Sequence, residues 1–145
     1  MNISGIDYNL NYKALEIYIS GCTLHCKGCH NYEIWDFNSG KPYFGYWDKI
    51  ILSKMRDPMI ENIWVMGGEP LDQNINLFVD FLKDICYKPI WLWTGYEKLE
   101  KTMYNKINIY LSYIKIGSYK KELPGYIEPL LGLELASSNQ KLIKV

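Results

Sequence analysis

The chain has 145 residues, of which 48% are hydrophobic and 22% are charged. This composition is typical of a folded globular protein, and the length predicts one domain over residues 1–145 with a buried core. Lysine and arginine balance aspartate and glutamate at 16 each, so the formal net charge is zero and no nucleic-acid partner is expected.

The N-terminal region and the apolar segments carry no export or membrane signal. Met1–Leu10 lacks a basic stretch followed by an apolar one, so we expect no signal peptide. No apolar run reaches the roughly 18 residues of a spanning helix, so no membrane partner is expected. These features predict a cytoplasmic protein, and disulfides are rare in the cytoplasm.

The first half of the chain alternates apolar and amphipathic segments. Ala14–Ser20 is short and rich in β-forming residues, which predicts a strand that ends at Gly21. Tyr46–Arg56 places apolar residues at helical spacing before Pro58, which predicts a helix. Asn62–Met66 is apolar on both faces, the pattern of a strand that is covered on both sides.

The second half continues this alternation. Asn74 is a predicted N-cap for a helix over Ile75–Tyr87, which carries an apolar stripe. The other predicted elements are a strand over Ile90–Trp93, a helix over Glu97–Asn105, a strand over Ile109–Ile116, an irregular segment over Gly117–Gly132 and a short strand over Lys141–Val145. This order predicts an α/β fold with an open, mostly parallel sheet of about five strands. In such sheets the functional loops follow the carboxyl ends of the strands.

Three cysteines follow the first predicted strand with the spacing C-x3-C-x2-C, at Cys22, Cys26 and Cys29. In a cytoplasmic chain this crowding predicts metal ligands rather than disulfides. Three thiolates on one loop can bind three irons of a cluster and leave the fourth iron without a protein ligand. Sulfur ligands also suit zinc, so the spacing alone leaves the metal open.

A structural zinc site would need a fourth protein ligand. The available candidates are His25, His30 and Cys86, or a carboxylate. His25 is better interpreted as a spacer with a solvated ring, and Cys86 as a buried small apolar residue at the end of a helix. The three-cysteine site therefore favours a cluster with one open position.

With this spacing the chain resembles the radical SAM superfamily. A second motif supports the resemblance: Gly67-Gly68-Glu69-Pro70 follows the second apolar strand and is similar to the superfamily's GGE motif. The resemblance implies a partial radical SAM (βα) barrel, and a 4Fe–4S cluster on Cys22, Cys26 and Cys29.

The same resemblance implies where S-adenosylmethionine binds. Gly67, Gly68 and Glu69 are expected to hold its methionine end, and Thr94 is expected to serve the ribose. Contacts are also expected around Gly28, Cys29 and His30, although Gly28 stands where many members carry an aromatic residue that meets the adenine. No catalytic acid or base is assigned beyond the cluster and the cosubstrate.

Further segments narrow the resemblance to the activating enzymes of glycyl radical enzymes. Cys29-His30-Asn31, Trp93–Tyr96, Tyr113–Tyr119 and Ser137–Gln140 are similar to segments of the activases of anaerobic ribonucleoside-triphosphate reductase. The resemblance implies reductive cleavage of S-adenosylmethionine and formation of a glycyl radical on the large reductase subunit. It also implies an electron donor of flavodoxin type or another low-potential carrier. The alternatives are an activase of another glycyl radical enzyme and a non-catalytic zinc-binding interaction module.

Overall fold

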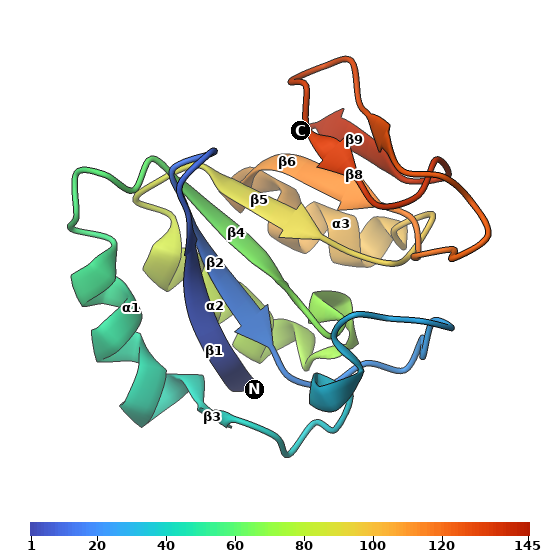
Figure 1. The fold of residues 1–145 in the computed structure, drawn as a ribbon. Helices are drawn as coiled ribbons and strands as arrows, with labels where there is room; N and C mark the ends of the chain where they lie inside the picture. Colours follow the sequence, from blue (N-terminus) through green and yellow to red (C-terminus); the bar gives the residue numbers. More distant parts are fainter.

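A computed structural model describes residues 1–145 and contains one large sheet and one small one (Figure 1). The large sheet has seven strands in the order β3-β1-β2-β4-β5-β6-β9. Its strands are β1 (Asn2–Asn9), β2 (Ala14–Ile19), β3 (Lys41–Pro42), β4 (Asn62–Gly67), β5 (Ile90–Trp93), β6 (Leu111–Ile116) and β9 (Lys141–Lys144). The small sheet is a hairpin of β7 (Tyr126–Ile127) and β8 (Glu134–Leu135).

The large sheet is mixed. Strands β2, β4, β5 and β6 pair in parallel, whereas β1 pairs antiparallel with β2 and β3, and β9 pairs antiparallel with β6. The expectation of a mostly parallel five-stranded sheet that forms a partial radical SAM (βα) barrel is therefore wrong. The physical reason is that both flanks of the sheet are built by chain reversals, which add antiparallel strands without a crossover helix.

Three α-helices accompany the sheet: α1 (Asp48–Lys54), α2 (Ile75–Ile85) and α3 (Lys101–Ile107). The predicted N-cap of α2 is confirmed, because the Asn74 side chain accepts hydrogen bonds from the backbone N–H groups of Asn76 and Leu77. None of the helices is long and apolar enough to cross a bilayer.

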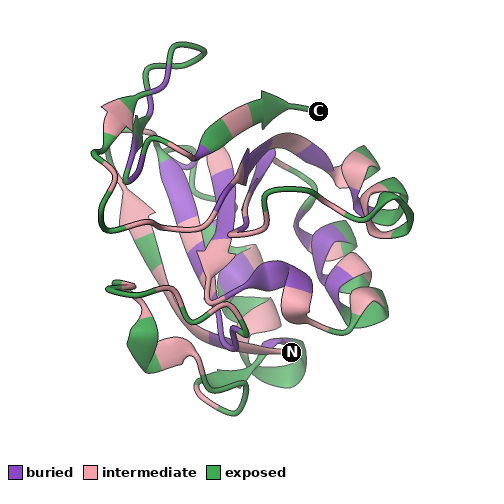
Figure 2. Cartoon of the chain, turned by 90° about the vertical axis from the view of Figure 1, so that its right-hand side faces the viewer, coloured by how far each residue is buried: buried purple, intermediate pink, exposed green.

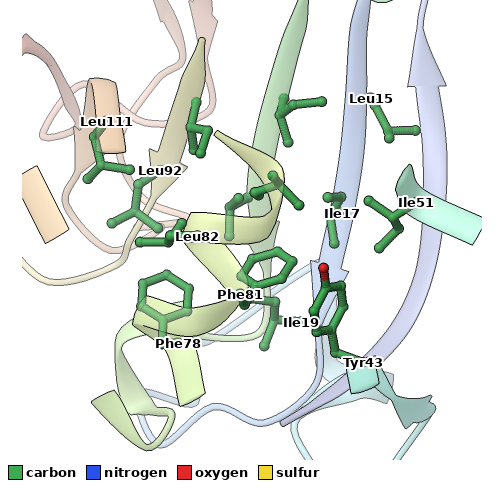
Figure 3. Close-up of a cluster of buried hydrophobic side chains, with 14 of the residues drawn as sticks. Leu15, Ile17, Ile19, Tyr43, Ile51, Phe78, Phe81, Leu82, Leu92 and Leu111 are labelled. Atoms are coloured by element: carbon green, nitrogen blue, oxygen red, sulfur yellow. The ribbon is translucent and has the colours of Figure 1, made fainter. Parts of the chain in front are cut away.

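The main core lies between the helices and one face of the sheet (Figure 3). Leu15, Ile17 and Ile19 alternate along β2 and point to this face. Phe78 and Phe81 of α2 pack against them, and both are essentially fully buried. Each such side chain contributes about 1.5–3 kcal/mol through burial, so this core holds the strands in place.

The opposite face of the sheet carries a smaller aromatic cluster. Trp64 and Trp91 stack with ring centroids 5.5 Å apart, and Leu133 and Leu135 from the β7–β8 hairpin segment cover them. Figure 2 shows the buried residues concentrated in the central strands and on the inner side of the helices, while the tip of the hairpin is exposed. The hairpin therefore closes part of the face that has no helices.

The four parallel strands end at the same edge of the sheet (Figure 1). The loop with the three cysteines follows β2, and Gly68 and Glu69 follow β4. Thr94 follows β5, and Gly117 follows β6. This edge brings together segments that are far apart in the chain and positions the candidate site.

Candidate functional site at the carboxyl edge of the sheet

A cavity at this edge brings together most of the residues that the sequence singled out. The predicted residues that line it are Cys22, Cys26, Cys29, His30, Gly67, Gly68, Glu69 and Thr94. Gly28 does not line the cavity and is exposed. The cysteine loop, defined here as residues 21–31, forms one wall, and the loops after β4 and β5 form another.

In the cysteine loop, the residue before each cysteine has a left-handed backbone conformation. Gly21, His25 and Gly28 directly precede the three cysteines, and all have positive φ angles, of 96°, 46° and 75°. Glycine adopts this left-handed region freely, but His25 pays a steric cost there. The His25 ring stacks on Trp35 with centroids 4.4 Å apart, and the residue is exposed.

The cysteine loop docks closely on the turn after β4. The Glu69 N–H donates to the Gly21 carbonyl at 2.7 Å, and the Asn31 side chain donates to the Gly67 carbonyl at 3.1 Å. A Cβ atom at Gly68 would lie 2.2 Å from the Gly21 carbonyl oxygen. This position therefore requires glycine, because any side chain would push the two loops apart.

The Glu69 carboxylate is buried and links the turn after β4 to the loop after β5. Its oxygens accept from the Leu71 N–H at 3.0 Å, the Thr94 hydroxyl at 2.8 Å and the Gly95 N–H at 2.7 Å. Burial raises the pKa of Glu69, while these hydrogen bonds lower it in part. The Thr94 hydroxyl also accepts from the Tyr96 N–H at 3.1 Å, so both predicted side chains take part in the framework of the site.

Lys115 is a cavity residue that the sequence reasoning missed. It is 8% exposed, and its ammonium donates to the carbonyls of Gly117 at 2.9 Å and Thr94 at 3.4 Å. None of the three ion pairs in the chain involves it. Burial lowers its pKa to about 8, although Glu69 and Cys26 oppose the shift. A single lysine within the apolar strand Leu111–Ile116 was the signal that could have revealed it.

The three thiol groups are free and share the cavity without being preassembled for a metal. The chain contains no disulfide, and no group of three or more histidine, cysteine or carboxylate side chains is already gathered at metal-binding geometry. The Asn31 N–H donates to the Cys29 Sγ at 3.4 Å, and burial raises the pKa of the Cys22 thiol. The side chains must therefore converge when a metal group binds.

Comparison with known protein families decides the kind of metal group. The family described as "4Fe-4S single cluster domain" matches residues 13–143, which includes the whole cavity wall described above. The chain belongs to this 4Fe–4S single cluster family. Membership indicates an iron–sulfur cluster rather than a structural zinc ion.

Curated relatives of this 4Fe–4S chain share the name anaerobic ribonucleoside-triphosphate reductase-activating protein. The relative from Salmonella typhi is 31% identical over 133 residues, which cover 86% of this chain and 83% of that protein. The relative from phage T4 is 31% identical over 113 residues, covering 74% and 72%. The relative from Pasteurella multocida is 29% identical over 116 residues, covering 73% of both. No solved structure matches the chain.

The donor set of the cavity fits the cluster of a 4Fe–4S family member. Soft thiolate sulfur is the usual ligand of such clusters, and three free cysteines line a single cavity here. The fourth cysteine, Cys86, does not line the cavity. The expectation that Cys86 is buried is wrong: it follows the last turn of α2, is exposed, and donates its S–H to the Lys83 carbonyl.

An aromatic ring from the loop after β6 also lines the cavity of this 4Fe–4S protein. The Tyr119 ring lies 5.4 Å from the His30 ring, centroid to centroid. Its Cε1 atom is 3.7 Å from the place where a Cβ atom of Gly28 would lie, and the Lys121 Cδ atom is 3.2 Å from that place. Side chains from a distant segment thus lie next to Gly28, which itself is exposed.

Proposed function

We propose that residues 1–145 form one radical SAM activase domain that activates an anaerobic ribonucleoside-triphosphate reductase. The main support is that three free cysteines and the Gly67–Glu69 turn line one cavity in a chain of the 4Fe–4S single cluster family. Relatives that carry the name of this activating protein align over most of the chain.

Cys22, Cys26 and Cys29 would hold the cluster. When bound, the cluster would supply one electron for cleavage of S-adenosylmethionine to methionine and a 5′-deoxyadenosyl radical, which would take a hydrogen atom from a glycine Cα of the reductase to give 5′-deoxyadenosine and a glycyl radical. The chain itself supplies no acid or base for this step. Its own contribution is to bind and orient the cosubstrate beside the three thiolates and to limit the access of water.

The charged end of S-adenosylmethionine finds complementary groups on the wall opposite the cysteine loop. Gly67 and Gly68 line the cavity, and Glu69 Oε2 accepts one hydrogen bond, from the Gly95 N–H, while a carboxylate oxygen can accept more than one. Lys115 brings a buried cation that forms no ion pair with a carboxylate of the chain. An ammonium carries three N–H donors, so Lys115 can bind the cosubstrate carboxylate while keeping its two carbonyl partners.

The remaining residues of the proposed site face the nucleoside part of the cosubstrate. The Tyr119 ring offers an aromatic surface for the adenine, next to His30 and the backbone of Gly28 and Cys29. The Thr94 hydroxyl accepts one hydrogen bond and keeps a second acceptor position for the ribose.

Two protein partners follow from this proposal. The large catalytic subunit of the reductase is the protein substrate, and a flavodoxin-type or other low-potential carrier donates the electron. The cavity is at an open edge of the sheet rather than inside a closed barrel, and this arrangement leaves room for a glycine-bearing loop of the partner.

Anaerobic reconstitution with iron and sulfide tests the proposal. We expect a brown protein with about four irons per chain that converts S-adenosylmethionine to 5′-deoxyadenosine and methionine under a strong reductant. Replacing Cys26 with Ala should abolish both cluster assembly and cleavage. Cys86→Ala is the matched control and should retain both, because Cys86 is exposed and outside the cavity. One tightly bound zinc and a colourless protein would contradict the proposal.

A further inference from the structure

The Asp72 side chain connects three loops at the carboxyl edge of the sheet. Its Oδ2 atom accepts from the backbone N–H of Thr23 at 2.7 Å and from the Thr23 hydroxyl at 2.8 Å. Its Oδ1 atom accepts from the Tyr96 hydroxyl at 2.6 Å. Thr23 directly follows the first cysteine, Asp72 ends the turn after β4, and Tyr96 lies in the loop after β5.

Thr23 is the single anchor of the central part of the cysteine loop. Within residues 23–30 no other residue makes a hydrogen bond to a group outside the loop. The other hydrogen bonds between the cysteine-loop region and the end of β4 or its following turn lie on either side of this segment, at Ser20, Gly21 and Asn31. Among residues 23–30, which include Cys26 and Cys29, Asp72 is therefore the one hydrogen-bond partner outside the cysteine loop.

The chemistry of this junction makes it strong. No lysine or arginine pairs with Asp72, so its charge is stabilised by the three hydrogen bonds themselves. Hydrogen bonds to an ionised carboxylate are about twice as strong as neutral ones. The bond to Asp72 is also the main reason that the pKa of Tyr96 is raised above its ordinary value.

We infer that Asp72 is a positioning residue that holds the cysteine loop in register with the cosubstrate-binding turn. This inference rests on the proposed function, in which Gly67–Glu69 bind the cosubstrate and the cysteine loop binds the cluster. Asp72 lies three residues after Glu69 and accepts hydrogen bonds from Thr23, the residue that follows Cys22. It thus fixes the two halves of the site relative to each other.

Replacing Asp72 with Asn tests the inference with little change in shape. The amide NH₂ cannot accept a hydrogen bond, so at least one donor of Thr23 or Tyr96 loses its partner. In the cluster-free protein, hydrogen exchange over residues 22–30 should become about tenfold faster. In the reconstituted protein, we expect full iron content but a 5′-deoxyadenosine kcat that falls about 10- to 100-fold, because small misplacements of reacting groups are costly.

Asp84→Asn is the matched control. Asp84 lies on α2, outside the cavity, and its carboxylate accepts from the Tyr43 hydroxyl at 3.2 Å. Like Asp72→Asn, this variant replaces a carboxylate that accepts from a tyrosine. It should leave both the loop exchange and kcat unchanged. The SAM-induced change in the electron paramagnetic resonance (EPR) spectrum of the reduced cluster should weaken in Asp72→Asn and persist in Asp84→Asn.

The outcomes separate the inference from the proposed function. Wild-type loop exchange and kcat in Asp72→Asn would overturn the inference, as would loss of the cluster in a variant that is otherwise folded. If Asp72→Asn does not fold, the same measurements on Thr23→Val test the inference instead. This variant removes the hydrogen bond from the Thr23 hydroxyl to Asp72, so hydrogen exchange in the loop should become faster. A wild-type protein that binds the cluster but never cleaves S-adenosylmethionine would reject the proposed function, while the exchange data would still test the anchor.

Discussion

Lys115 places a cation in the interior of the candidate site. Its ammonium is bound by two backbone carbonyls, and the Trp93 ring centroid lies 5.9 Å from Nζ. A buried charge without a carboxylate partner is costly, so a lysine at this position is better explained by an anionic ligand than by stability.

Replacing Lys115 with Met tests this environment through pH. The pKa of Lys115 in the folded protein is about 8, below the ordinary value of 10.5, because burial disfavours the charged form. The unfolded chain therefore binds more protons between pH 8 and 10.5, and the folded wild type gains stability as pH rises through this window. We expect the free energy of unfolding of wild type minus that of Lys115→Met to increase by about 2 kcal/mol from pH 7 to pH 10.

Urea unfolding of the cluster-free proteins at both pH values measures this difference. Lys144→Met, on the exposed strand β9, is the control and should show no such change. If the difference in free energy of unfolding between wild type and Lys115→Met did not change with pH, the pKa of Lys115 would not be lowered by burial, and this account of its environment would be wrong.

At the residue scale, the sequence revealed the groups that are close together in the chain. The spacing of the three cysteines and the Gly67-Gly68-Glu69-Pro70 motif predicted residues on both walls of the cavity. Lys115 and Asp72 could not be assigned in the same way. Their partners, Thr94, Thr23 and Tyr96, come from other loops, and the strand order that joins these loops is not written in any local pattern.

Among the elements, the β7–β8 hairpin is stabilised by one acidic side chain. The buried Glu128 carboxylate accepts from the backbone N–H groups of Leu130, Leu131 and Leu133 at 2.8–3.1 Å. Burial alone would raise the pKa of Glu128, but these hydrogen bonds outweigh it and the pKa is lowered. Glu128 therefore orders the turn whose following residues cover Trp64 and Trp91.

Glu128→Gln should loosen this hairpin. The amide NH₂ of glutamine would face a backbone N–H donor and could not accept from it. The free energy of unfolding of the variant should therefore fall by about 2 kcal/mol, and its Tm by about 4–8 °C. Tryptophan fluorescence should report the exposure of the aromatic cluster. The pKa of Glu128 is lower in the folded than in the unfolded chain, so its ionised form stabilises the fold at pH values above the unfolded-state pKa. The difference in free energy of unfolding between wild type and Glu128→Gln should therefore shrink as pH falls through the folded-state pKa. Glu134→Gln, exposed on β8, is the control; an equal loss in both variants would contradict this role.

At the element scale, the strands with two buried faces were the predictable ones. Ile90–Trp93 is a strand with the predicted bounds, and Asn62–Met66 extends by one residue. Strand β1 was not predicted because it mixes polar residues with its apolar ones, as suits a strand near the sheet edge. The two-residue strands β3, β7 and β8 are too short to leave a periodic pattern.

In the whole molecule, the antiparallel strands at the two flanks of the sheet decide the architecture. Strand β1 reverses onto β2 and strand β9 reverses onto β6, which turns the expected parallel sheet into a mixed one. The carboxyl edge of the four central strands still gathers the loops that form the cavity. Helices cover one face of the sheet, and the hairpin covers part of the other (Figure 1). The cavity therefore lies at an edge of an open sheet rather than inside a closed barrel.

Hydrogen transfer from the partner is the most direct test of the whole account. The large reductase subunit would be prepared with glycine deuterated at Cα and mixed anaerobically with the reconstituted chain, S-adenosylmethionine and a low-potential reductant. We predict deuterium in the 5′-deoxyadenosine, detected by mass spectrometry, together with a glycyl radical signal in the EPR spectrum of the large subunit. Production of 5′-deoxyadenosine without deuterium, and without a glycyl radical, would contradict the account.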